Sequence, residues 1–321
     1  PPTLAVLAWQ WLQDADLATN AQGAAAGGVL ALAVGLSAAL VWGLQKGMRR
    51  HAPRVDGRRG TGQGVAHTGP SVGAALLITV YATVLLALAV GSVAGVWPFP
   101  AVWPDTLSLQ AWHSVWASRA TVLTTLGLAA ASAALALAWC VAWLECAPRH
   151  WDSVLRPLLY LPLLLPAVLW VVGLYGMALW LRIEGRWPAL LLAHTLMALP
   201  YVLLALTPAY KGFDPRYRAI SDSLGHHHGH FLLRIKWPLL RRALAASAAV
   251  GFAVSVAQYL PTLYLGAGRW ATVTTEAVTL AAGAQRSLTS AYAGLQWLLP
   301  VLGFALAAWV GRPRRFTVPA S

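Results

Sequence analysis

The chain has 321 residues, of which 58% are hydrophobic and only 10% are charged, and its formal net charge is +13. Soluble domains carry about a quarter charged residues, so this composition excludes an ordinary soluble protein. A strongly basic soluble chain would suggest nucleic acid. Here the basic residues are sorted between loops instead, and no nucleic-acid partner is expected.

Apolar runs without charged residues recur along the chain, each roughly 20 residues or longer, which is enough to cross ~30 Å of hydrocarbon as a helix. In lipid, only helices and closed barrels satisfy the backbone polar groups, and these runs are too long and unbroken for barrel strands. The predicted fold class is therefore all-α: a polytopic transmembrane helical bundle of about seven spans, surrounded by membrane lipid. The runs are 24–44, 71–97, 120–144, 158–181, 187–208, 243–266 and 291–310.

The basic residues predict which loops face the cytoplasm. If 209–242 is cytoplasmic and the spans alternate, then 45–70, 145–157 and the tail 311–321 lie on the same side. These four segments hold 18 of the 23 lysines and arginines. The other side keeps the remaining five, so the distribution follows the positive-inside rule. Those five are Arg119, Arg182, Arg186, Arg269 and Arg286.

The segment 45–70 separates the first span from the others. It is rich in Gly and Arg and poor in apolar residues, which is typical of a solvated linker. The segment before it, 1–50, has a polar outer part, one span, Trp42 near the inner end and then a basic run. The end of the chain, 270–315, repeats this order with Trp309 in the equivalent place. This weak repeat suggests two related units.

The loop 209–242 contains signals for two short helices. Asp214 is suited to cap a helix whose first residue is Pro215, and Gly225 is suited to the left-handed position that ends it. A second short helix is predicted from about residue 230 to 236, ending before Pro238. One face of the first helix would carry Tyr217, Ile220 and Leu224. A helix pair at the membrane surface indicates a docking element.

The same loop carries a resemblance to a known family. Gly225 is followed by nine residues, Ile235, one residue, Trp237 and Pro238. This spacing resembles the coupling loop of permeases of ATP-binding-cassette (ABC) importers, the MetI-like family. Their pattern is Glu-Ala-Ala, three residues, Gly, nine residues, Ile, any residue, Leu, Pro. The sequence departs from it, because Trp237 replaces Leu and Ala-Ile-Ser replaces Glu-Ala-Ala. The residues that the resemblance assigns to the ATPase-coupling loop are Ala219, Ile220, Ser221, Asp222, Gly225, Ile235 and Pro238.

The resemblance, which covers about 71–311, implies function and partners. A MetI-like permease unit would dock its coupling helix pair on a separate cytoplasmic ABC ATPase, itself a dimer. It would receive a small solute from an extracytoplasmic binding protein and work beside another permease unit in the bacterial inner membrane. The chain has no phosphate-binding Gly-x-x-x-x-Gly-Lys-Ser/Thr loop, so it is not expected to be an enzyme or to need a cofactor.

The resemblance also implies a domain division. Residues 1–50 are expected to be the last span of a truncated first permease unit, 51–70 a cytoplasmic linker, and 71–321 a second permease unit with six spans. The whole protein would then be a fused double permease. The transported solute stays open among iron, thiamine, oxyanions and others.

Few polar side chains lie within the spans. His194 and Gln258, with the helix-kinking Pro200 and Pro261, are candidates for a translocation path. The alternative for His194 is a hydrogen-bonded packing residue. The cluster His226–His230 could bind zinc, nickel or copper, but consecutive side chains point in different directions, and no metal site is expected.

Two other classes of function compete with the importer. A secondary transporter or channel would need no ATPase, but proton- or sodium-coupled carriers usually place carboxylates in their spans, and here these are nearly absent. A membrane-embedded enzyme would need a constellation of polar groups at one depth of the membrane, and the spans contain none.

Overall fold

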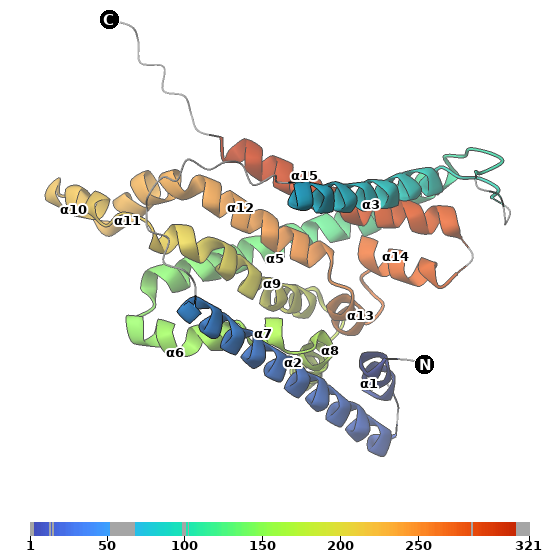
Figure 1. The fold of residues 1–321 in the computed structure, drawn as a ribbon, viewed down its shortest axis with the longest axis horizontal. Coiled ribbons are helices and arrows are strands. Elements are labelled where there is room, and N and C mark those ends of the chain that lie inside the picture. Colours follow the sequence, from blue (N-terminus) through green and yellow to red (C-terminus); the bar gives the residue numbers. More distant parts are fainter. Residues whose placement is uncertain are drawn as a thin grey trace, which may run out of the picture.

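The computed structural model describes residues 3–12, 14, 16–51, 68–97, 101, 103–283 and 285–312, and every regular element in these ranges is a helix (Figure 1). The predicted all-α class is confirmed. The helices are α1 Leu4–Leu12, α2 Leu17–His51, α3 Thr68–Ser92, α4 Gln110–Ala117, α5 Arg119–Cys146, α6 Arg149–Leu159, α7 Leu161–Leu164, α8 Ala167–Trp180, α9 Trp187–Lys211, α10 Arg216–Ser223, α11 His228–Phe231, the π-helix η1 Leu232–Lys236, α12 Trp237–Val256, α13 Leu260–Gly266, α14 Val273–Ala281 and α15 Arg286–Val310.

Among the described residues, six helical segments are long and apolar enough to span a membrane, and a bent helix pair brings the number up to seven. The six lie within α2, α3, α5, α9, the continuous helix His228–Val256, and α15. The prediction of about seven spans is therefore confirmed, although two of the predicted spans differ in form. In the described residues, α2 continues to His51, so the first part of the predicted linker 45–70 is helical, and residues 52–67 lie outside the described ranges.

The span predicted over 158–181 is broken. Helices α6 and α7 form one arm and α8 the other, and the two arms meet at 107°. The cause is local. Leu165 precedes a proline and has extended backbone dihedrals (φ −84°, ψ 143°), because the proline ring disfavours the helical conformation in the residue before it. Pro166 then stands at the start of α8.

The span predicted over 243–266 also has different bounds. Helix α12 ends at Val256 and α13 begins at Leu260, so Gln258 lies in the break and not within a helix. Pro261 lacks an N–H for the carbonyl of Ala257, and its ring would clash with that carbonyl in a continuous helix. The membrane helix gains length at its other end instead, because it begins at His228.

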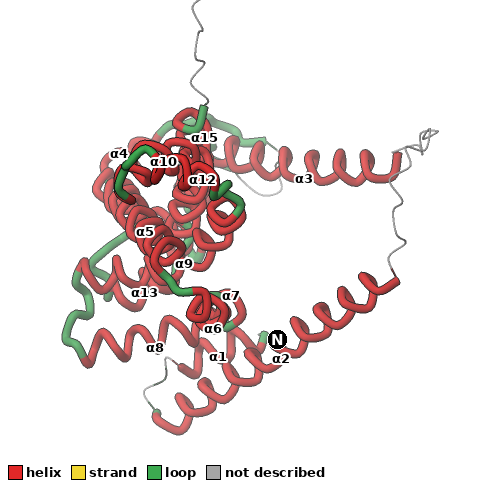
Figure 2. The backbone as a smooth tube through the Cα atoms, turned by 90° about the vertical axis from the view of Figure 1, so that its left-hand side faces the viewer, coloured by secondary structure: helices red, strands yellow, loops and turns green. Residues whose placement is uncertain are grey.

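The centre of the bundle is formed by α5, α9 and α12, which pack closely on one another. At Gly251 on α12, an added Cβ would lie 2.8 Å from Val202 of α9 and 3.4 Å from Ala133 of α5. Small residues let membrane helices approach in this way. Helix α15 packs on α12, and α3 and α14 pack on α15. Figure 2 shows the central group from the side of α10, with α2 and α3 extending away from it.

Helix α2 is largely bare of partners within the described chain. Its apolar side chains, such as Leu32 and Leu36, are mostly exposed, and its main contacts are with α1, α7 and α8. Asp16 stabilises its first turn, because hydrogen bonds from the Thr19 hydroxyl and from the Ala18 and Thr19 amides hold the pKa of this carboxyl below its usual range. A long apolar helix with so little cover requires lipid or another helix around it.

Candidate functional site

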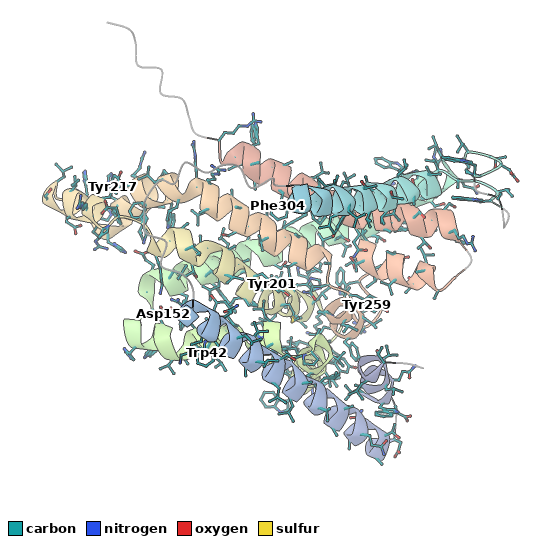
Figure 3. All side chains as sticks on the ribbon, in the orientation of Figure 1. Trp42, Asp152, Tyr201, Tyr217, Tyr259 and Phe304 are labelled. Carbon is teal, nitrogen blue, oxygen red and sulfur yellow. The ribbon has the colours of Figure 1, made fainter. Side chains whose placement is uncertain are left out.

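Helices α10 and α11 protrude from one end of the molecule, between the ends of α9 and α12 (Figure 1). Figure 3 places Tyr217 of α10 at this end, and Tyr259, which lies between α12 and α13, toward the opposite end. The segment 212–236 is named the hairpin below. It is the end where the sequence concentrates basic residues, and it is the loop that the sequence singled out.

Asp214 caps the start of α10 as the sequence predicts, although the helix begins one residue later than expected. Helix α10 begins at Arg216 and not at Pro215. Asp214 Oδ1 accepts a hydrogen bond from the Arg216 amide at 2.9 Å. A carboxylate in this place satisfies an N–H that has no partner within the helix, and it opposes the positive end of the helix dipole.

Gly225 ends α10 in the left-handed conformation that the sequence predicts, with φ +75°. The His226 amide donates to the Ser221 carbonyl at 3.1 Å, and the Gly225 amide donates to the Asp222 carbonyl at 3.0 Å. These two bonds form a Schellman motif, which satisfies carbonyls left free at a helix end. The motif turns the chain directly from α10 into α11.

Within α10, every side chain except that of Ser221 is exposed. Ser221 is fully buried and Phe231 of α11 is 3% exposed, whereas Tyr217, Ile220 and Leu224 are 47%, 58% and 67% exposed. The predicted apolar face therefore exists and has no cover within the described chain. Phe213 packs beneath the helix, with its ring centroid 5.5 Å from that of Tyr217 and 6.2 Å from that of Phe231. Among the other residues assigned to the coupling loop, Ala219 and Asp222 are exposed and Ile235 is half-buried.

The second short helix does not end before Pro238, so that expectation is wrong. Helix α11, η1 and α12 run on as one helix from His228 to Val256, and Pro238 lies in the first turn of α12. A proline lacks the N–H for an ordinary helical bond and crowds the carbonyl four residues before it. The wider π-helical turn over Leu232–Lys236 directly precedes this proline, and such a turn accommodates a disturbed hydrogen-bond ladder.

A carboxylate on α5 joins the base of the hairpin to two membrane helices. Glu145 Oε2 accepts hydrogen bonds from the Tyr210 hydroxyl of α9 at 2.7 Å and from Lys236 Nζ of η1 at 2.6 Å. His228 Nε2 lies 3.3 Å from the other oxygen, Oε1. The Glu145 and Lys236 side chains are each only 13% exposed. We name these four residues, Glu145, Tyr210, His228 and Lys236, the Glu145 clamp.

The sequence analysis singled out His228 only as part of the histidine cluster, and it assigned no role to Glu145, Tyr210 or Lys236. The available signal was a lone carboxylate, Glu145, at the end of an otherwise uncharged span. A second acidic group, Asp152 of α6, lies on the same side of the molecule but does not touch the hairpin. It accepts hydrogen bonds from Arg156 Nε at 2.9 Å and Trp143 Nε1 at 3.3 Å, and it pairs with Lys211.

The histidine cluster is stacked around the turn of the hairpin. The rings of His226 and His230 stack with centroids 4.1 Å apart, whereas His227 is 6.3 Å from His230 and His228 faces Glu145. Within the described ranges, no group of three or more His, Cys, Asp or Glu side chains could hold a metal ion.

A chain of hydrogen bonds connects two of the four candidate path residues, His194 and Gln258. His194 is 1% exposed, and its Nδ1 and Nε2 lie 2.9 Å from Ser255 Oγ and 3.0 Å from Thr262 Oγ1. The Thr262 hydroxyl donates its single hydrogen to the Gln258 carbonyl at 3.0 Å. Nε2 of His194 must therefore donate to Thr262, and Nδ1 accepts from Ser255. Pro261 adjoins Thr262, and Pro200 is buried elsewhere on α9.

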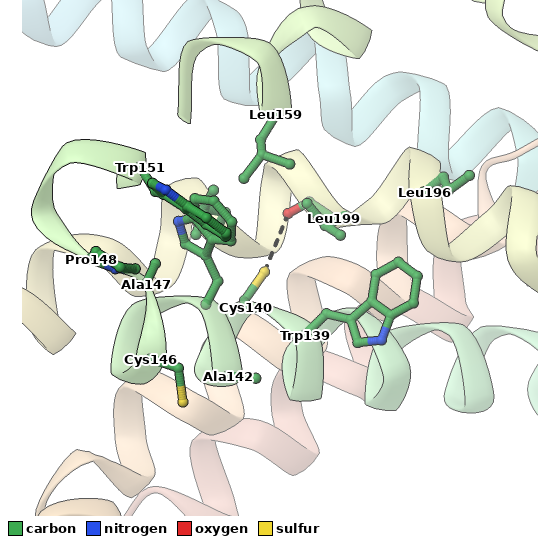
Figure 4. Close-up of a pocket in the computed structure, with 12 residues that line it drawn as sticks. Trp139, Cys140, Ala142, Cys146, Ala147, Pro148, Trp151, Leu159, Leu196 and Leu199 are labelled. Carbon is green, nitrogen blue, oxygen red and sulfur yellow. Dashed lines mark hydrogen bonds between the residues drawn. The ribbon is translucent and has the colours of Figure 1, made fainter. Parts of the chain in front are cut away.

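An apolar groove of about 450 Å³ opens between α5, α6 and α9 (Figure 4). Cys140 lies at its floor, where the thiol contacts the Leu199 carbonyl at 3.6 Å. The Trp139 and Trp151 side chains on its walls are about half exposed. Such a groove offers hydrocarbon contacts and no constellation of polar groups to bind a hydrophilic solute.

The fold and the hairpin together define a polytopic membrane protein with a short helix, α10, between the ends of two of its spans. Residues 146–315 match the family described as the binding-protein-dependent transport system inner membrane component, and the chain belongs to this family. It is a family of transport permeases and not of enzymes, as predicted, and its fold is the expected MetI-like helical bundle.

Several curated proteins are similar to the chain. The inner membrane ABC transporter permease protein YnjC of Escherichia coli is 38% identical over 321 residues, which cover 98% of this chain and 57% of that protein. The thiamine transport system permease protein ThiP of Salmonella typhimurium is 28% identical over 62% of this chain and 38% of its own length. The molybdenum transport system permease protein ModB of Mycobacterium tuberculosis is 30% identical over 36% of this chain and 48% of its own length. The chain thus matches only part of the length of each of these relatives.

Proposed function

We propose that this chain is the membrane-spanning permease subunit of an ABC importer in a bacterial inner membrane. A separate cytoplasmic ABC ATPase, acting as a dimer, drives it, and an extracytoplasmic solute-binding protein delivers a small solute. Membership of the transport permease family and the ABC permease name of YnjC support this proposal. The positive-inside charge distribution supports a cytoplasmic hairpin.

The observation that carries the proposal is the bare apolar face of α10. Tyr217, Ile220 and Leu224 are about half exposed or more, on a helix that lies beyond the ends of the membrane spans. Clustered apolar side chains in water mark a surface that binds a partner. An amphipathic helix laid into a groove of the ATPase would bury this face, in the common helix-in-groove mode.

Within this proposal each residue of the coupling loop has its own role. Ile220 makes the contact with the ATPase, and Ala219 and Asp222 border it. Ser221 packs α10 onto α11, and Gly225 sets the turn. Ile235 and Pro238 belong to the segment that passes directly into the membrane helix α12.

The test is co-purification from native membranes. The unsubstituted protein should bring down a protein with vanadate-sensitive ATP hydrolysis, and Ile220→Asp should lose it, because an aspartate cannot be buried in an apolar groove without a large cost. Leu107→Asp is the matched control, since Leu107 is 74% exposed on the outer side. Equal recovery of the ATPase with both variants would refute docking through α10. Solute uptake that survives without any ATPase would favour the secondary transporter or channel.

We also propose that the chain contains parts of two permease units. Residues 1–50 are the last span of a first unit, 51–70 link the units, and 71–321 form the second unit with six spans. The sparse contacts of α2 with the remaining helices support the division, as does the greater length of YnjC. In the full-length protein, cleavage at a protease site inserted at residues 58–60 should leave two fragments that still co-purify and transport. Loss of transport on cleavage would count against two separable units.

The proposed translocation path lies beside His194 and the broken segment at Gln258, with Pro200 and Pro261 shaping the helices around it. Because the path has so few polar groups to bind a solute, the binding protein would select the solute and the permease would act as a gated conduit. His194→Leu should leave the choice of solute unaltered. A switch in solute preference would show that the permease carries a recognition site of its own.

A further inference from the structure

The hairpin is joined by the chain itself to only two membrane helices. Residues 212–215 lead into it from α9, and η1 leads out of it into α12. Helix α5, the third member of the central group, has no such connection. Any movement of the hairpin therefore reaches α5 only through side-chain contacts.

The Glu145 clamp supplies such a contact at the C-terminal end of α5, next to the hairpin. One oxygen of Glu145 accepts bonds from both Tyr210 of α9 and Lys236 of η1, so a single carboxylate ties α5 to the helix that leads into the hairpin and to the hairpin's last turn. Lys236 Nζ also lies 4.1 Å from the Tyr210 ring centroid. The Trp237 indole donates to the Tyr210 hydroxyl at 3.4 Å, which closes the group. Charges with this little exposure attract more strongly than surface charges, so the pair resists separation.

The π-helical turn determines where Lys236 points. With one extra residue in a turn, each later side chain points about 100° behind its direction in an ordinary helix, where the residue before it would have pointed. Lys236 is directed inward to Glu145, whereas Leu233 and Arg234 of the same turn are exposed. π-helical turns are frequent at functional sites, and this one carries a clamp residue at its last position.

At its other end, α5 contacts the helices of the outer side. The Val273 amide at the start of α14 donates to the Thr125 hydroxyl of α5 at 2.9 Å, and both residues are buried. Helix α5 therefore links the hairpin end to the outer end by a contiguous chain of packed and hydrogen-bonded groups.

We propose that Glu145 is a positioning residue of the transport cycle. It holds the end of α5 to α9 and η1, so that displacement of the hairpin moves three helices as one body and carries the motion to α14. This inference rests on the proposed coupling to an ATPase.

The test measures whether α5 follows the hairpin. Cys146 is exposed beside Glu145, and Cys140 is buried and is replaced by alanine. Spin labels at Cys146 and at Ala219→Cys, on the side of α10 away from its apolar face, report the distance between α5 and the hairpin. The full-length protein with its co-purified ATPase is measured without nucleotide and after trapping with ATP and vanadate.

In the unsubstituted clamp, the distance distribution should be the same in both states. With Glu145→Gln it should shift by about 2 Å or more, or broaden, on trapping, because helix displacements in switching proteins are of this size. Lys236→Met should change the distance distribution on trapping in the same way as Glu145→Gln. The double variant should show no larger change than either single variant, as expected for partners in one interaction.

Asp152→Asn is the matched control. Asp152 joins α5, α6 and α9 on the same side through Trp143, Arg156 and Lys211, but it does not touch the hairpin. It should lower thermal stability and leave the distance unchanged on trapping. A shift as large as that of Glu145→Gln would show general loosening and overturn the clamp.

Three further outcomes would overturn the inference. A shift on trapping in the unsubstituted protein, or no shift with Glu145→Gln, would show that Glu145 does not couple α5 to the hairpin, and would leave the docking proposal intact. Failure of any ATPase to co-purify would refute the proposed function and the clamp with it.

Discussion

Replacing Gly225 by alanine should loosen the turn of the hairpin without disturbing the membrane bundle. Gly225 has φ +75°, and no atom lies within 4 Å of the position that a Cβ would take. The substitution therefore causes no clash, and its cost is the conformational penalty of a side chain in the left-handed region, about 1–2 kcal/mol. Since 1.4 kcal/mol is about a factor of ten, the local ordering equilibrium should weaken by roughly 5- to 30-fold.

Hydrogen exchange of the backbone amides measures this equilibrium. The His226 amide, which donates to the Ser221 carbonyl, should lose protection by that factor in Gly225→Ala. Gly229→Ala is the control, because Gly229 lies in α11 without a positive φ and its added Cβ would meet His227 only at 3.4 Å. Alanine is favoured in a helix by about 1 kcal/mol, so protection should stay or rise. Equal protection in Gly225→Ala and the unsubstituted protein would refute the reasoning.

Three further predictions concern other parts of the chain. Pro238→Ala restores a backbone N–H and should convert η1 to an ordinary helical turn; Lys236 would then turn away from Glu145, and the Cys146–Ala219→Cys distance should broaden. His194→Leu leaves the Ser255 hydroxyl without its partner and should lower the apparent unfolding temperature by several degrees, since an orphaned buried polar group costs about 1–3 kcal/mol; an unchanged temperature would contradict this. In a cysteine-free background, an impermeant maleimide applied to intact cells should label Asp105→Cys and not Asp214→Cys; the reverse pattern would invert the topology.

Groups that act locally could be predicted from the sequence. The length of an apolar run indicates a membrane segment, because the hydrocarbon core is about 30 Å thick, and the distribution of basic residues orients it, but run length did not reveal the breaks at Pro166 and before Pro261. The caps of α10 could be predicted for the same reason: Asp214 and Gly225 act on amides and carbonyls within five residues of themselves. That Tyr217, Ile220 and Leu224 share one face of α10 followed from helical periodicity, whereas their exposure is known only from the structure.

The sequence shows where the prolines lie, but it does not show which of them interrupt a helix. Pro166 and Pro261 interrupt predicted spans, whereas Pro238 lies inside a continuous helix. The residues near each proline do not distinguish these outcomes. A wider helical turn over η1 precedes Pro238, and its lysine is held by a carboxylate on another helix.

Only the tertiary structure brought the partners of buried polar groups together. Glu145 is separated by 65 residues from Tyr210 and by 91 from Lys236, and His194 is 61 and 68 residues from the two hydroxyls that bind it. A buried polar side chain must find hydrogen-bond partners, but composition and periodicity do not say which distant groups will supply them. The packing of α5, α9 and α12 makes that choice, because close approach at Gly251 brings their ends within hydrogen-bonding distance.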